Sequence, residues 1–300
     1  MLWLMFRLYS VNDTNNLFLN YFGHNEHLSS SQRFYYKFLK NHLSTMESFS
    51  NTVSIIIQGP LNNRSINTID NYLKYGEVIV SCWNNNDISQ LDKYKDKIKI
   101  VVNNYNDVKD LQIKTNLKNP NIFQNHTTLN GLKEATGFFS IKLRSDESYP
   151  NLDNLISKLK SIRDSKDDRG VYNDHKIITS NIYFRFDKQA KFHPSDHIIA
   201  GQTKRMIDIF KKSTFLSHQK NIKLSPEQII CKAAIETYYD PINKKHDSLD
   251  NSRSIELMKK HFDIIRINSL PNCIWTSSYR KYDPLRAEEV WCHGINELDK

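Results

Sequence analysis

The chain has 300 residues, enough for one large α/β domain or two smaller ones, and its composition excludes a disordered protein. Charged residues make up 25% and hydrophobic residues 39%, as in globular proteins. The 42 basic and 33 acidic residues give a formal charge of +9, which suits a partner that carries phosphate. The basic residues are scattered and form no nucleic-acid-binding signature, so nucleic-acid binding is the less favoured explanation of this charge.

A helical extension is predicted over residues 1–50. Its opening stretch, MLWLMFRLYS, is apolar but interrupted by Arg7, so it is too short to span a membrane and lacks the cleavage site of a signal peptide. Further along, Phe34 and Phe38 fall near helical spacing. We expect this extension to precede a single domain over residues 51–300, and peripheral contact of the opening stretch with a membrane is left open.

From residue 52 onward, predicted strands alternate with predicted helices. Strands are expected at TVSIII (52–57), EVIVSCW (77–83), KIKIVVN (97–103) and GFFSIKL (137–143), and helices at 66–75, 127–136 and 151–164. Strands that alternate with helices of about ten residues indicate βαβ units and a parallel sheet. Continuous apolar runs such as SIII are typical of strands that are covered on both faces.

Beyond residue 170 the pattern is mixed. HKIITSNIYF (175–184) is strand-like, residues 197–213 pass from a strand into a helix, and residues 225–239 begin a helix. Residues 240–300 are less periodic, and we expect them to wrap around the domain.

The ends of the predicted strands are polar. In an open parallel sheet, ligands bind outside the carboxyl ends of the strands, so these ends are expected to share one edge. The first strand ends in Gln58 and Gly59, where a tight turn with exposed backbone amides is expected, and Arg64 follows. An ordinary strand-to-helix turn explains the same residues.

The fourth strand ends in RSDE, which contains two adjacent carboxylates. Asp146 and Glu147 fit a divalent cation, because Mg²⁺ is commonly held by one or two carboxylates together with phosphate oxygens of the substrate. Strand alternation places Arg144 on the same side as Asp146, where it would pair with that acid or reach the phosphate. A solvated turn is the alternative explanation.

Two later acids are candidates for the catalytic base. Asp196 lies in FHPSDH, before an apolar strand, where a plain turn is the alternative explanation. Glu227 lies in the first turn of a helix that Ser225 caps, and a carboxylate there would accept a proton from an acceptor hydroxyl. The helix dipole alone also favours an acid at this position.

Taken in order, IIIQGPL, NTIDNYLKYGEVIVSCW, GFFSIKLRSDE, FHPSDHIIAG and SPEQ resemble the WavE-type lipopolysaccharide-synthesis family, which is similar to GT-A glycosyltransferases. The resemblance covers about residues 52–235. It implies a GT-A-like (Rossmann-like), mostly parallel sheet flanked by helices, with Asp146 at the metal-binding acid of the Asp-x-Asp motif and Glu227 at the base of inverting enzymes. Ser145 and Glu147 depart from a strict Asp-x-Asp.

The expected function is transfer of a sugar from a nucleotide-diphosphate sugar to a hydroxyl of a glycan or lipid-linked acceptor. Donor phosphates would lie beside Gln58 and Gly59, and Mn²⁺ or Mg²⁺ would bind at Asp146. A catalytically degenerate protein that only binds nucleotide or glycan is the alternative. The four cysteines form no CxxC pair, which favours reduced thiols and a cytoplasmic protein, with a peripheral membrane location left open.

Overall fold

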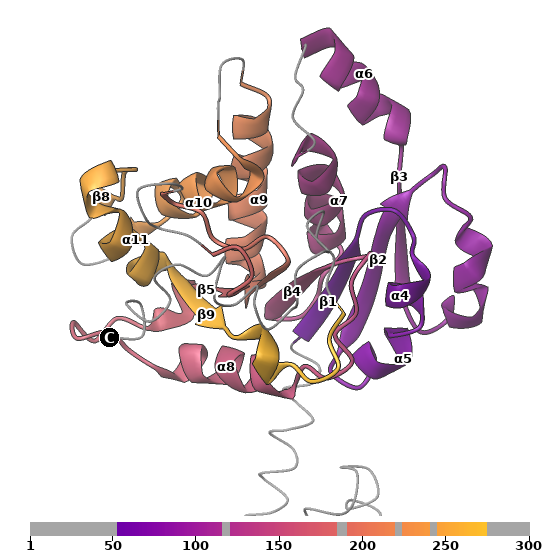
Figure 1. Cartoon of the computed structure of the whole chain (residues 1–300), viewed down its shortest axis with the longest axis horizontal. Coiled ribbons are helices and arrows are strands. Elements are labelled where there is room, and N and C mark those ends of the chain that lie inside the picture. Colours follow the sequence, from indigo (N-terminus) through magenta and orange to yellow (C-terminus); the bar gives the residue numbers. More distant parts are fainter. Residues whose placement is uncertain (1–52, 116–120, 185–190, 220–223, 241–244, 275–300) are drawn as a thin grey trace, which may run out of the picture. The chain divides into compact units, whose positions relative to one another are not determined.

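A computed structural model describes residues 53–115, 121–184, 191–219, 224–240 and 245–274. They form a seven-stranded sheet in the order β3-β2-β1-β4-β6-β5-β9, with helices against it (Figure 1). The predicted fold class, a mostly parallel α/β sheet flanked by helices, is confirmed. The helical extension predicted over residues 1–50 lies outside the described residues, so this part of the domain division stays a prediction.

The first four strands lie close to their predicted positions and run parallel. They are β1 (Val53–Gln58), β2 (Glu77–Trp83), β3 (Lys99–Asn103) and β4 (Phe139–Arg144). β1 pairs in parallel with both β2 and β4, and β2 with β3. All six residues of β1 are buried, as expected for a strand of β-branched residues with helices on both faces of the sheet.

The remaining strands differ from the parallel pattern that the sequence predicted. β6 (Ile198–Gln202) pairs antiparallel with β4 and with β5 (Ile177–Ser180), while β9 (Phe262–Ile265) runs parallel to β5. β9 belongs to the region that was expected to wrap around the domain, and it instead forms an edge strand of the sheet. Because β6 is antiparallel, its first residue lies beside the last residues of β4.

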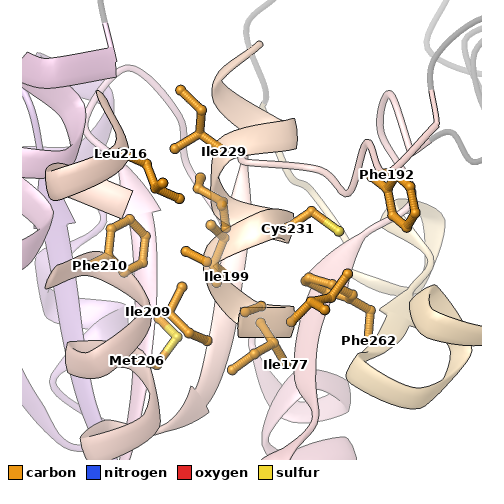
Figure 2. Close-up of a cluster of buried hydrophobic side chains, with 14 of the residues drawn as sticks. Ile177, Phe192, Ile199, Met206, Ile209, Phe210, Leu216, Ile229, Cys231 and Phe262 are labelled. Carbon is orange, nitrogen blue, oxygen red and sulfur yellow. The ribbon is translucent and has the colours of Figure 1, made fainter. Parts of the chain in front are cut away.

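Four helices cover one face of the sheet around a large apolar core. They are α7 (Asn121–Lys133), α9 (Thr203–Ser217), α10 (Pro226–Glu236) and α11 (Ser254–His261). Figure 2 shows side chains of α9 and α10 packed with residues of β5, β6 and β9. Gly131 brings α7 close to β1, since a Cβ there would lie 2.6 Å from Ile56 Cγ2.

Other helices complete the domain. They are α4 (Asn63–Ile66), α5 (Ile69–Tyr72), α6 (Tyr105–Thr115) and α8 (Asp153–Asp164). In a separate two-stranded sheet, β7 (Tyr239–Asp240) pairs antiparallel with β8 (Lys245–His246). Of the helix predicted over residues 66–75, only the short α5 lies wholly inside the range, and α4 ends at its first residue. The Thr68 hydroxyl donates to the Arg64 carbonyl between the two helices. Within the described ranges, no helix has the length and apolarity needed to cross a membrane.

Candidate active site

The strand ends meet along one edge of the sheet, as the parallel pattern predicted. Gln58 lies opposite Arg144 of β4 and opposite Ser81 of β2, and Trp83 lies opposite Asn103 of β3. We call this the carboxyl edge, the edge at which β1 to β4 end. Ile198 lies opposite Leu143, so the residues before β6 also arrive here.

Residues 191–197, which we call the approach segment, run along the carboxyl edge and contact several elements. The Ser195 hydroxyl lies 2.7 Å from the Ser180 hydroxyl at the end of β5. The carboxylate of Asp196 accepts a hydrogen bond from Gln124 of α7 (2.9 Å). The Nδ1 atom of His197 lies 2.5 Å from Glu147 Oε1. Consecutive side chains of this segment therefore bind different parts of the domain.

Arg144 and Asp146 form a forked ion pair at the carboxyl edge. Arg144 Nε and Nη2 donate to Asp146 Oδ1 and Oδ2 at 3.0 and 2.9 Å. Burial disfavours the charged guanidinium, but the bonds to Asp146 and the nearby Glu147 raise the pKa of Arg144 above its ordinary value. Both side chains stay accessible, with 30% of Arg144 and 38% of Asp146 exposed. Arg64 Nη1 donates to the Asp146 carbonyl (3.3 Å).

Glu147 points into the protein instead. Its carboxylate accepts from the Tyr149 hydroxyl (2.6 Å), lies 2.5 Å from His197 Nδ1 and has no exposed side-chain surface. Burial would lower the pKa of His197, but the charge of Glu147 and its hydrogen bond raise it overall. Burial, followed by the charge of Glu147, raises the pKa of Tyr149 well above its ordinary value. The Glu147 carboxyl group is thus buried beside His197 and Tyr149, and Arg144 Nε lies 3.5 Å from its Oε1 atom.

The two carboxylates of RSDE do not fit a shared metal site. Asp146 gives both oxygens to Arg144, whereas the oxygens of Glu147 contact His197 and Tyr149. In the part of the chain that the structure describes, no three His, Cys, Asp or Glu side chains are grouped to hold a metal ion. A divalent cation therefore stays a prediction, and we assign it no chemical step.

The two candidate bases have different surroundings. Burial would raise the pKa of Asp196, but the charges of Lys142 and His197 lower it to about 2, which makes this carboxylate a weak base. Glu227 lies in the first turn of α10, where Ser225 forms a capping box with Gln228. Its Oε2 atom lies 3.4 Å from Nε2 of His193 in the approach segment. Glu227 therefore contacts the approach segment, to which Asp196 belongs, and it stays the predicted base.

Gln58 and Gly59 hold the turn after β1 through bonds within the protein. The Gln58 Oε1 atom accepts from the Thr127 hydroxyl of α7 (2.8 Å), and the Gly59 N–H donates to the Ser81 carbonyl (3.1 Å). The amide that was expected to be exposed is therefore already bonded. Gly59 has φ +116°, and a Cβ there would lie 2.9 Å from Ser145 Oγ, so both conformation and space require glycine.

Lys142 is the site residue that the sequence reasoning missed. It lies in the middle of β4, is fully buried, and donates through Nζ to the Asp196 carbonyl. Burial lowers the pKa of Lys142 to about 8, against the opposing charge of Asp196. A lysine inside an apolar strand, two residues before Arg144 and so on the same face, was the available signal.

A model of the family described as WavE lipopolysaccharide synthesis matches residues 53–265. Two solved structures also match. The apo-form glycosyltransferase GlyE from Streptococcus pneumoniae TIGR4 is 11% identical at TM-score 0.41, with 80% of this chain and 59% of that chain covered. HddC from Yersinia pseudotuberculosis is 12% identical at TM-score 0.36, with 72% and 90% covered. This chain thus spans less than two thirds of the GlyE chain, and no curated protein matches it.

Proposed function

The chain belongs to the WavE lipopolysaccharide synthesis family, and from this premise we propose that it is a glycosyltransferase of lipopolysaccharide synthesis. The donor is a nucleotide-diphosphate sugar, and the acceptor is a hydroxyl of a glycan or of a lipid-linked glycan. The described cysteines Cys82, Cys231 and Cys273 are free, which accords with a cytoplasmic setting.

The observation that carries this proposal is the group of cations at the carboxyl edge. Arg64 and Arg144 both contact Asp146, and Lys142 lies behind them in β4. An open α/β sheet binds its ligands at this edge, and guanidinium groups match phosphate oxygens. These arginines support a binding position for the donor diphosphate beside Arg64 and Arg144, next to the turn at Gln58 and Gly59.

The chemistry follows from this placement. Transfer breaks the bond between the anomeric carbon and the diphosphate oxygen, and the electron pair leaves with the diphosphate. The acceptor oxygen forms the new bond and gives its proton to a base, for which Glu227 is the candidate. Cations fixed beside the leaving diphosphate stabilise the charge that develops on it in the transition state.

The test combines binding and turnover. The full chain is incubated with a panel of nucleotide sugars and a truncated lipopolysaccharide acceptor, with and without Mn²⁺. We expect one donor to raise the melting temperature and to release nucleoside diphosphate while the acceptor gains the mass of one sugar. Binding without an acceptor product would instead support a degenerate binding protein. A panel in which no donor binds would refute the proposal.

A further inference from the structure

Arg144 is accessible and cationic, yet two of its guanidinium nitrogens already donate to Asp146, an acid of the turn that follows β4. We propose that Asp146 occupies the place of the donor diphosphate, which displaces the Asp146 carboxylate from Arg144 and is neutralised by protein cations, so that no divalent metal is required. This inference rests on the proposed use of a diphosphate donor.

The geometry of the pair supports an exchange of one anion for another. Two parallel N–H bonds join the Arg144 guanidinium to the two oxygens of Asp146, at 3.0 and 2.9 Å. A guanidinium presents the same donors to a phosphate as to a carboxylate. With 30% of Arg144 and 38% of Asp146 exposed, an incoming ligand reaches the pair from solvent.

Asp146 is also the acid of this site that is most easily displaced. The exposed fraction of its side chain is 38%, against 0% for Glu147 and 8% for Asp196. Exposed ion pairs contribute little to stability, whereas breaking a buried pair leaves an uncompensated charge in the interior at a large cost. An arriving diphosphate therefore replaces Asp146 and leaves the other two acids in place.

The charges that remain suit a diphosphate. Arg64 bonds to the backbone carbonyl of Asp146, so it stays in position when the carboxylate moves away. Arg144 and Lys142 then face Glu147 and Asp196 with one acid fewer, and Arg64 adds a further positive charge. Because Glu147 is enclosed by His197 and Tyr149, it is not free to join Asp146 in holding a metal between protein and phosphate.

The two explanations of Asp146 predict opposite effects of the same substitution. If Asp146 is a metal ligand, Asp146→Asn weakens the binding of a diphosphate. If Asp146 competes with the diphosphate for Arg144, Asp146→Asn strengthens it. Inorganic pyrophosphate is the suitable probe, because its binding does not depend on which nucleotide or sugar the donor carries.

The experiment is calorimetric titration of the full chain with pyrophosphate in EDTA. We expect wild type to bind, Asp146→Asn to bind about tenfold more tightly, which equals ~1.4 kcal/mol, and Arg144→Gln to bind at least about tenfold more weakly. Arg144→Lys keeps the charge but loses the fork, and should also weaken binding. It serves as the second variant should Arg144→Gln not fold.

A matched control separates this effect from net charge. Arg163 and Asp164 form the same forked pair at the end of α8, with bonds of 2.7 and 3.2 Å. Asp164→Asn changes the charge of the chain equally and should leave pyrophosphate binding unchanged. The inference is overturned if wild type binds pyrophosphate only with Mn²⁺, if Asp146→Asn weakens binding, or if Asp164→Asn gives the same gain. Expected pyrophosphate binding without transfer from any donor would instead refute the proposed function alone.

Discussion

Lys142 offers the sharpest test of the buried charges in this site. Its ammonium is fully buried in β4 and donates to the Asp196 carbonyl. Burial lowers the pKa of Lys142 from 10.5 to about 8. In the unfolded chain the same ammonium is solvated and keeps its ordinary pKa, so the two states bind different numbers of protons at alkaline pH.

The sign of the effect follows from this difference. Between pH 8 and pH 10.5 the unfolded chain holds a proton on Lys142 that the folded chain has released, so protonation favours the unfolded state. The destabilisation of the folded state by buried Lys142 has its full size below about pH 8. It disappears as the pH rises toward the pKa that Lys142 has in the unfolded chain. The full shift corresponds to on the order of 3 kcal/mol, of which about 2 kcal/mol is recovered between pH 7.5 and pH 9.5.

The assay is urea unfolding of wild type and Lys142→Met at these two pH values. Asp196, whose pKa depends on Lys142, titrates far below this pH range, so the change with pH in the difference between the two unfolding free energies reports on Lys142. We expect Lys142→Met to be more destabilising at pH 9.5 than at pH 7.5 by about 2 kcal/mol. Lys133→Met alters an exposed lysine of α7, and its unfolding free energy should differ from that of wild type by the same amount at pH 7.5 and at pH 9.5. A difference that does not change with pH for Lys142→Met would refute the reasoning.

Three further substitutions test other parts of the site. Gly59→Ala would have to keep φ +116° and would place a Cβ 2.9 Å from Ser145 Oγ, so its free energy of unfolding in urea should fall by about 1–3 kcal/mol. Gly170→Ala, at φ +77° with open space around it, should lower the free energy of unfolding by less. Glu227→Gln should lower sugar transfer by about 10²-fold while donor binding persists, whereas Glu256→Gln, in the first turn of α11, should leave transfer unchanged. Normal transfer by Glu227→Gln would show that the base was wrongly chosen. Tyr149→Phe leaves a buried Glu147 oxygen without its 2.6 Å donor and should lower the unfolding free energy by about 1–3 kcal/mol; unchanged stability would mean that water replaces the hydroxyl.

The central strands were predictable because their signal is local. The β-branched run of β1 and the apolar run of β2 specify buried strands, and the helices between strands specify parallel pairing. The shared edge then follows from topology, and the structure places Gln58 opposite Arg144 there. Asp146 was one of two partners considered for Arg144, and the two side chains do pair, but Asp146 lies in the turn after β4 and not in the strand, so strand alternation does not explain the pairing.

The direction of β6 was not predictable from local pattern. Whether IIAGQ runs parallel or antiparallel to β4 depends on contacts between segments far apart in the sequence, here Ile198 with Leu143 and Gly201 with Ser140. The approach segment reaches the carboxyl edge only because β6 is antiparallel. For the same reason, the contacts of Lys142 with Asp196 and of Glu147 with His197 could not be predicted from RSDE or its strand alone.

The approach segment couples the stability of the domain to its chemistry, and this determines which residues can test function. Ser195, Asp196 and His197 each bond to a different element, and all three are buried. A substitution in this segment therefore disturbs folding and the site together, and a loss of activity there identifies no catalytic role. Arg144 and Asp146 are accessible and meet solvent, so a change in ligand binding at these two residues is separable from a change in folding.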